Sequence, residues 1–121
     1  MQSLINPKTH ELHCQDPWFT LIRNGKKIVE GRKNLAKFKS WAPGDIIIFK
    51  FKHNFFKAQI TAMRRYKSLE EYLDCEGISK VLPGINTKEE AIKIYLQWSS
   101  LEEIKKYGFL AIEIRLIKNS D

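Results

Sequence analysis

The sequence has few of the features that mark secreted or membrane-spanning proteins. It contains two cysteines, Cys14 and Cys75, and its N-terminus lacks the apolar stretch of a signal peptide. Its longest apolar runs, such as Ile46 to Phe49, fall far below the roughly 20 residues that a membrane-spanning helix needs. We therefore expect an intracellular protein, cytoplasmic or nuclear, with no membrane partner and with both cysteines as free thiols.

Low-complexity segments and internal repeats are also absent from the 121 residues. A chain of this length can bury one core but is too short for two ordinary domains. We therefore expect one domain over residues 1–121, with its core at about residues 11–117.

The sequence has few His and Cys residues at the spacing that is usual for the ligands of a zinc site. A zinc site could recruit His10, His13 and Cys14, but no second pair of ligands stands at zinc spacing. One of the two cysteines could also be a nucleophile paired with His13 or His53, although most such thiols are small packed hydrophobic groups. We predict no metal site and no cofactor.

Acidic residues are few in the first half of the chain. Residues 1–66 hold 13 Lys and Arg against 4 Asp and Glu, whereas residues 67–121 hold 8 against 10. Positive charge of this density attracts polyanions through counterion release and long-range steering. Nucleic acid is therefore the leading partner class, because no basic amphipathic helix supports an anionic membrane surface.

The densest charge lies in residues 25–32, GKKIVEGR. In an extended strand alternate residues share a face, so Glu30 and Arg32 point one way and Lys27 points the other. Lys27 and Glu30 can serve one site only if Lys27 lies at the strand's entry, where the turn at Gly25 sets its direction, or if a bulge intervenes. The other interpretation is an exposed basic strand with solvated charges.

Alternating apolar residues and turn signals predict about five strands. The predicted strands are residues 11–14, 28–33, 45–52, 55–65 and 109–117. In the fourth strand the predicted core face is Phe56, Ala58, Ile60 and Ala62, and in the last it is Leu110, Ile112, Ile114 and Leu116.

Helix signals precede the second strand and follow the fourth. Asp16 and Pro17 are predicted to begin a short helix that Gly25 ends in a left-handed conformation. Three hydroxyl residues, each followed three positions later by a glutamate, predict capping boxes: Ser68, Thr87 and Ser100. The predicted fold is α+β, a small curved β-barrel of about five strands with flanking helices and a helical insertion before the last strand.

Two further groups of lysines could meet nucleic acid. In residues 33–41, lysines interleave with Leu35, Phe38 and Trp41, which either grip phosphates and stack bases or are core anchors between solvated lysines. Lysines 50, 52 and 57 fall on paired strands, where they either form a positive ridge or discourage edge pairing.

The spacing of Gly25, Lys27, Glu30 and Arg32 fits the G-x-K-x-x-E-x-R signature of ASCH (activating signal cointegrator homology) domains of the PUA-like superfamily. Further landmarks that look like small single-domain members are Pro43-Gly44-Asp45 before an apolar strand, Val81-Leu82-Pro83-Gly84, and Tyr107-Gly108 before the last strand. The sequence therefore resembles this family over about residues 11–117. The resemblance implies a PUA-like β-barrel, with a cleft lined by the motif and a role in RNA binding.

The leading hypothesis is a nucleic-acid-binding module, with single-stranded RNA as the favoured partner. In it Lys27 and Arg32 contact phosphate or base edges, and Glu30 orients them or accepts from a base amine. The residues predicted to bind nucleic acid are Lys26, Lys27, Glu30, Arg32, Lys33, Lys50 and Lys52.

The competing hypothesis is a small hydrolase acting on RNA or on a modified nucleoside such as acetylcytidine, with Lys27 and Glu30 as its catalytic pair. Some small family members are hydrolases of these kinds, but the acetylcytidine amidohydrolases have a threonine at the position of Glu30, so their nucleophilic hydroxyl is absent here. Two further possibilities are a protein-interaction adaptor and a purely structural Glu30–Arg32 ion pair that closes the barrel.

Overall fold

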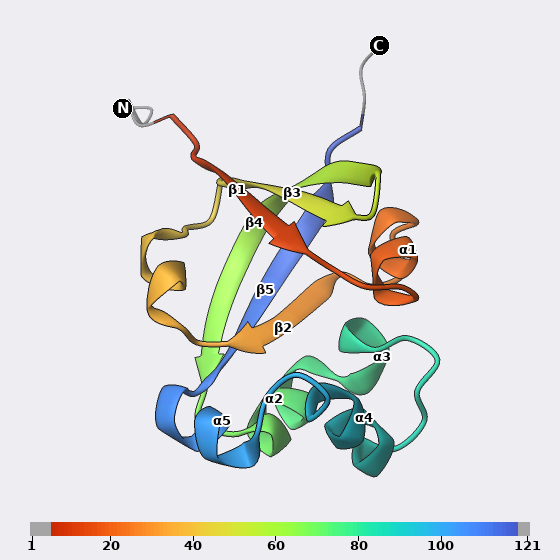
Figure 1. Cartoon of the computed structure of the whole chain (residues 1–121), viewed down its shortest axis with the longest axis vertical. Coiled ribbons are helices and arrows are strands. Elements are labelled where there is room, and N and C mark those ends of the chain that lie inside the picture. Colours follow the sequence, from red (N-terminus) through yellow and green to blue (C-terminus); the bar gives the residue numbers. More distant parts are fainter. Residues whose placement is uncertain (1–5, 119–121) are drawn as a thin grey trace.

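The computed structural model of the chain describes residues 6–118, which form one curled sheet with helices around it (Figure 1). The elements are β1 (Thr9–His13), α1 (Trp18–Arg23), β2 (Val29–Lys33), the 3-10 helix η1 (Ala36–Ser40), β3 (Ile46–Phe51), β4 (Asn54–Tyr66), α2 (Leu69–Glu76), α3 (Ile78–Val81), α4 (Lys88–Tyr95), α5 (Leu101–Tyr107) and β5 (Phe109–Leu116). This confirms the predicted α+β fold, with four helices inserted before the last strand. No helix within the described residues is long and apolar enough to cross a membrane.

The five strands lie in the order β1-β3-β4-β5-β2. β1 runs parallel to β3, and every other neighbouring pair is antiparallel. β2, which carries the charged motif, is therefore one edge of the sheet, and β1 is the other. Because the sheet curls, these two edge strands approach each other (Figure 1).

The first four residues of β5, Phe109 to Ile112, are buried on both faces, which explains why their sequence is continuously apolar. The predicted core face packs in one cluster through Leu110, Ile112 and Ile114. The opposite face contributes Phe109 and Ala111 to a second cluster, built with the inserted helices. The helical insertion therefore covers the beginning of the β5 face that alternation alone would assign to solvent, and Arg115 on the same face stays exposed.

The predicted alternation along β4 is correct only as far as Ile60. The register between β4 and β5 shifts between Ile60 and Ala62, so that Ala62 lies opposite Glu113 and Met63 lies opposite Ile112. Met63, rather than Ala62, then packs against the first core cluster. A β-bulge adds one residue to a strand and reverses the facing of everything beyond it.

The three predicted helix starts are confirmed. The side chains of Ser68, Thr87 and Ser100 each accept a hydrogen bond from the backbone N–H three residues later. Only Ser100 forms the reciprocal capping box with its glutamate. α3 was not predicted, since a helix of four residues is too short to show a periodic pattern.

Candidate nucleic-acid interface

Lys27 lies at the entry to β2, which is one of the two arrangements that would allow it to meet Glu30. Gly25 follows α1 with a φ of 85°, a left-handed conformation that a glycine adopts readily. The backbone N–H groups of Lys26 and Lys27 then both donate to the Leu21 carbonyl oxygen at 3.0 Å. The end of α1 therefore sets the direction of Lys27 before the strand begins, and no bulge is needed.

The Lys27 ammonium is buried and has three acceptors. The side chain is 2% exposed, and Nζ donates to the carbonyl oxygens of Val29, at 2.6 Å, and Val81. Nζ also lies 3.3 Å from Oε1 of Glu30. Burial lowers the pKa of the Lys27 amine, and the Glu30 carboxylate opposes that shift. Three acceptors match the three N–H donors of an ammonium, so Lys27 ties β2 to α3 and to Glu30.

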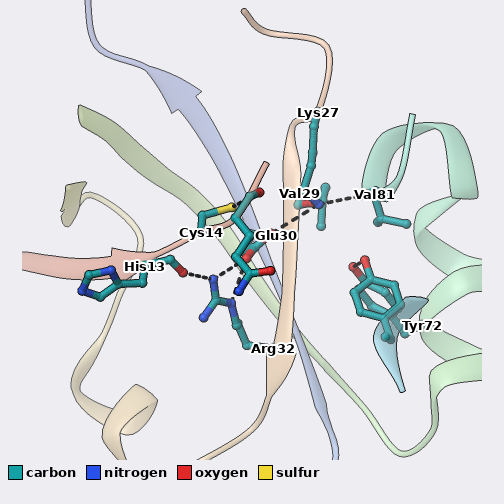
Figure 2. Close-up of polar contacts among 10 residues, drawn as sticks. His13, Cys14, Lys27, Val29, Glu30, Arg32, Tyr72 and Val81 are labelled. Atoms are coloured by element: carbon teal, nitrogen blue, oxygen red, sulfur yellow. Dashed lines mark hydrogen bonds and ion pairs between the residues drawn. The ribbon is translucent and has the colours of Figure 1, made fainter. Parts of the chain in front are cut away.

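Arg32 contacts the other oxygen of the Glu30 carboxylate, Oε2 (Figure 2). Its Nε donates to Oε2 of Glu30 at 2.8 Å, and Nη2 donates to the His13 carbonyl oxygen at 2.6 Å. Burial alone would raise the pKa of the Glu30 carboxyl, but Arg32 and Lys27 outweigh it and the net pKa is lowered. Glu30 is therefore an ionised, fixed anion at neutral pH. The Arg32–His13 hydrogen bond joins the two edge strands of the sheet.

A cavity of about 300 Å³, called here the motif cavity, opens beside these side chains. Its walls come from β2, the β1–α1 connection, η1 and the inserted helices. Its lining residues include Cys14, Trp18, Glu30, Arg32, Lys33, Lys37 and Trp98. Trp98 lies between α4 and α5 and is 45% exposed, and the Arg32 side chain is 29% exposed. The cavity thus presents an accessible indole and several cations around a buried carboxylate.

The cysteine in the cavity wall is poorly suited to nucleophilic chemistry. Burial, with the Glu30 carboxylate adding to it, raises the pKa of the Cys14 thiol to about 12. Cys14 and Cys75 are both free thiols, as predicted. Within residues 6–118 no group of three or more His, Cys, Asp and Glu side chains is placed to hold a metal ion. His10 is engaged elsewhere, stacked on Trp41 with its ring centroid 4.1 Å away.

The structure brings together four of the seven predicted nucleic-acid-binding residues. Lys27, Glu30, Arg32 and Lys33 all line the motif cavity, and Lys26, Lys50 and Lys52 do not.

The lysines of β3 and its turn have other partners. Lys50 forms an ion pair with Glu11 at 3.0 Å, and Lys52, in the turn after β3, has Nζ 5.2 Å from the centroid of the Phe51 ring.

Sequence reasoning did not single out Trp98 as a site residue. It stands in the short connection between two helices, outside the buried stripe of α4 that Ala91 and Tyr95 define. The signal available in the sequence was a tryptophan in the connection between two helices, the second of which begins at the cap Ser100. Its position over the motif depends on how the insertion folds back onto β2.

Comparison with known proteins identifies relatives that are similar to this chain over most of its length. A family model described as the ASCH domain matches residues 12–118. The crystal structure of hypothetical protein PH0355 is 42% identical with a TM-score of 0.84, covering 90% of this chain and 99% of that chain. Protein PF0455 from Pyrococcus furiosus is 37% identical with a TM-score of 0.76, covering 92% and 99%. No curated protein matches.

A mutant ASCH protein from Zymomonas mobilis shares the fold at lower similarity. It is 15% identical with a TM-score of 0.64, and the match covers 92% of this chain and 70% of that chain. The sheet curled into a half-barrel with flanking helices is thus the PUA-like arrangement expected from the sequence.

Proposed function

The chain belongs to the ASCH domain family, and from that premise we propose that it is a nucleic-acid-binding module whose ligand is single-stranded RNA. The observation that carries the proposal is the placement of the exposed Trp98 indole in one cavity with Arg32 and Lys33. An aromatic face stacks any base, and cations beside it attract the phosphates, which is how sequence-tolerant single-strand sites are built.

Arg32 is the residue best placed to contact the ligand directly. A guanidinium carries five N–H donors, and Arg32 uses Nε and Nη2 for Glu30 and His13. Nη1 has no hydrogen-bond partner within the described residues, so its donors are free for a phosphate or a base edge. Glu30 fixes the plane of this fork, and a fixed fork loses less entropy on binding.

Lys27 takes a different role in this proposal from the direct contact that the sequence suggested. All three of its donors are used within the protein, by Val29, Val81 and Glu30. It therefore positions Glu30, and through Glu30 it positions Arg32. Lys37, which lines the cavity and forms no ion pair within the described residues, supplies positive field there, together with Lys33, which is paired with Glu103.

The hydrolase alternative receives less support from the same geometry. A general base works best with a pKa near the operating pH, but the pKa of Glu30 is lowered by Arg32 and Lys27 against the effect of burial. An oxyanion stabiliser needs an unused donor, and Lys27 has none. Incubation with acetylcytidine followed by chromatography tests this alternative, and product formation that Glu30→Gln abolishes would establish it.

The binding proposal is tested by filter-binding titrations with single-stranded RNA at increasing salt. The affinity should fall as salt rises, with a slope of about −0.7 for each phosphate contacted. Trp98→Ala should weaken binding by about 5-fold to 150-fold, the equivalent of one stacked base. Phe55→Ala is the matched control, because Phe55 is 63% exposed and lines neither cavity described here.

Equal losses in the two variants would show that Trp98 is not the stacking surface. Absence of RNA binding by the wild-type protein, even at low salt, would contradict the proposed function as a whole.

A further inference from the structure

A second basic surface lies beside α5, outside the motif cavity. This groove, called here the α5 groove, has a volume of about 490 Å³. Its lining residues are Asn34, Arg65, Tyr66, Lys67, Lys105, Lys106, Tyr107 and Gly108. The lining therefore includes four cations and no carboxylate, although the groove is built largely in the acidic half of the chain.

The four cations are exposed, and none of them forms an ion pair with any residue in the described range 6–118. Arg64, by contrast, is held by Glu76 at 2.6 Å and by Glu113 at 2.8 Å. Lys105 and Lys106 suit the C-terminal end of α5 through the helix dipole. The dipole of α5 does not account for Arg65 and Lys67, because these residues lie at the end of β4 and just beyond it. The groove is thus lined by unpaired positive charges from the end of β4 and from α5.

An aromatic side chain accompanies these cations. Tyr107 is 40% exposed, and Lys106 places its Nζ 5.1 Å from the centroid of the Tyr107 ring. Tyr66 is held in the wall because its hydroxyl donates to Glu76. An exposed ring among unpaired cations is the composition of a surface that binds phosphates and stacks a base.

The α5 groove and the motif cavity share a wall. Lys33 lines the cavity and the next residue, Asn34, lines the groove, so their Cα atoms are about 3.8 Å apart. The backbone N–H of Asn34 donates to the Gly108 carbonyl oxygen at 3.0 Å, which holds this wall against the end of α5. Lys33 also pairs with Glu103 at 3.2 Å. That pair neutralises a carboxylate of α5 that would otherwise repel a phosphate passing between the two sites.

We propose that the α5 groove binds the phosphate backbone of the same RNA strand that enters the motif cavity. The inference rests on the proposed function, and it extends the footprint from one nucleotide to several. Figure 1 shows α5 beside the neighbouring ends of β2 and β4, where such a strand would cross from one site to the other.

The test compares two double variants that each remove two positive charges. K105Q/K106Q removes two groove cations, and K8Q/K93Q is the control, because Lys8 and Lys93 are exposed and line neither cavity. Filter binding to a twelve-nucleotide single-stranded RNA should show about a tenfold loss for the groove variant relative to the control. Its salt slope should become shallower by about 1.4, the value for two lost phosphate contacts.

A second groove variant, R65Q/K67Q, should reproduce the effect from the other element, and circular dichroism checks that each variant is folded. The proposal is overturned if the wild-type protein binds the RNA while both groove variants keep the affinity and salt slope of K8Q/K93Q. If the wild-type protein does not bind RNA at all, the groove proposal falls together with the proposed function, and that result is distinct from the first.

Discussion

The Glu30 carboxylate lies 3.3 Å from the buried ammonium of Lys27, and its other oxygen accepts from Arg32 at 2.8 Å. A buried anion between two cations gains from both and is not left uncompensated. Glu30 is therefore the centre of the motif, because its carboxylate links the buried Lys27 to the partly exposed Arg32. Its consequence is a guanidinium held at the wall of the motif cavity.

Removing Lys27 should destabilise the fold strongly. Lys27→Met leaves two carbonyl oxygens without their donor and takes one cation from Glu30, which should cost about 3–5 kcal/mol in the free energy of unfolding. Urea denaturation followed by circular dichroism measures it. Lys26→Met is the control, because the neighbouring side chain is exposed and should change stability by less than about 0.5 kcal/mol. Similar stabilities for the two variants would contradict the buried role of Lys27.

The stability of the protein should depend on the ionisation of Glu30 in acid. Its pKa is lowered in the folded state, despite burial, by Arg32 and Lys27. The stabilisation is therefore present above the unfolded-state pKa of about 4.3 and is lost as pH falls through the lower folded-state value. Urea denaturation from pH 7 to pH 3 should show a shallower decline for Glu30→Gln than for the wild type. Parallel curves would refute this linkage.

Adding a side chain at Gly31 should destabilise the fold, because the neighbouring side chains leave no space for a Cβ atom. A Cβ there would lie 2.3 Å from the Tyr72 hydroxyl oxygen and 2.7 Å from Cε2 of Phe109. Gly31→Ala should cost about 1–3 kcal/mol through overpacking, measured by thermal denaturation.

Gly84→Ala separates that steric effect from backbone strain, since a Cβ at Gly84 meets nothing within 4 Å although its φ is 95°. It should cost about 1 kcal/mol. A Gly31→Ala protein as stable as wild type would show that Tyr72 and Phe109 move aside easily.

The two thiols should react at very different rates. Burial and the Glu30 carboxylate raise the pKa of Cys14 to about 12, and the thiolate is the reactive form. Cys75 is exposed. Iodoacetamide at pH 8, followed by peptide mass spectrometry, should label Cys75 rapidly and leave Cys14 largely unmodified in the native protein. Denaturation in urea should equalise them, and rapid native labelling of Cys14 would contradict its burial.

The local features of the fold could be predicted because short-range chemistry decides them. The turn at Gly25, the caps at Ser68 and Ser100 and the alternation in β5 all depend on residues a few positions apart. Alternation also predicts that Lys27 and Glu30 would face opposite ways within a regular strand. It allows them to meet if Lys27 lies at the entry to the strand, which is the arrangement found.

The remaining features depend on contacts distant in sequence. Val81, which accepts from Lys27, lies 54 residues away, and no local pattern indicates that partner. The bulge between Ile60 and Ala62 carries no glycine to mark it. The parallel pairing of β1 with β3 and the position of Trp98 over β2 likewise depend on how the chain packs, not on its spacing.

The most direct test of the RNA-binding account is an amide and side-chain NMR titration of ¹⁵N-labelled protein with a short single-stranded RNA at low salt. The account predicts that the largest shifts fall on the Trp98 indole N–H, the Arg32 Nε–H and the backbone of Lys33, with small shifts at Lys50. Shifts confined to the β3–β4 hairpin, or no shifts at saturating RNA, would contradict it.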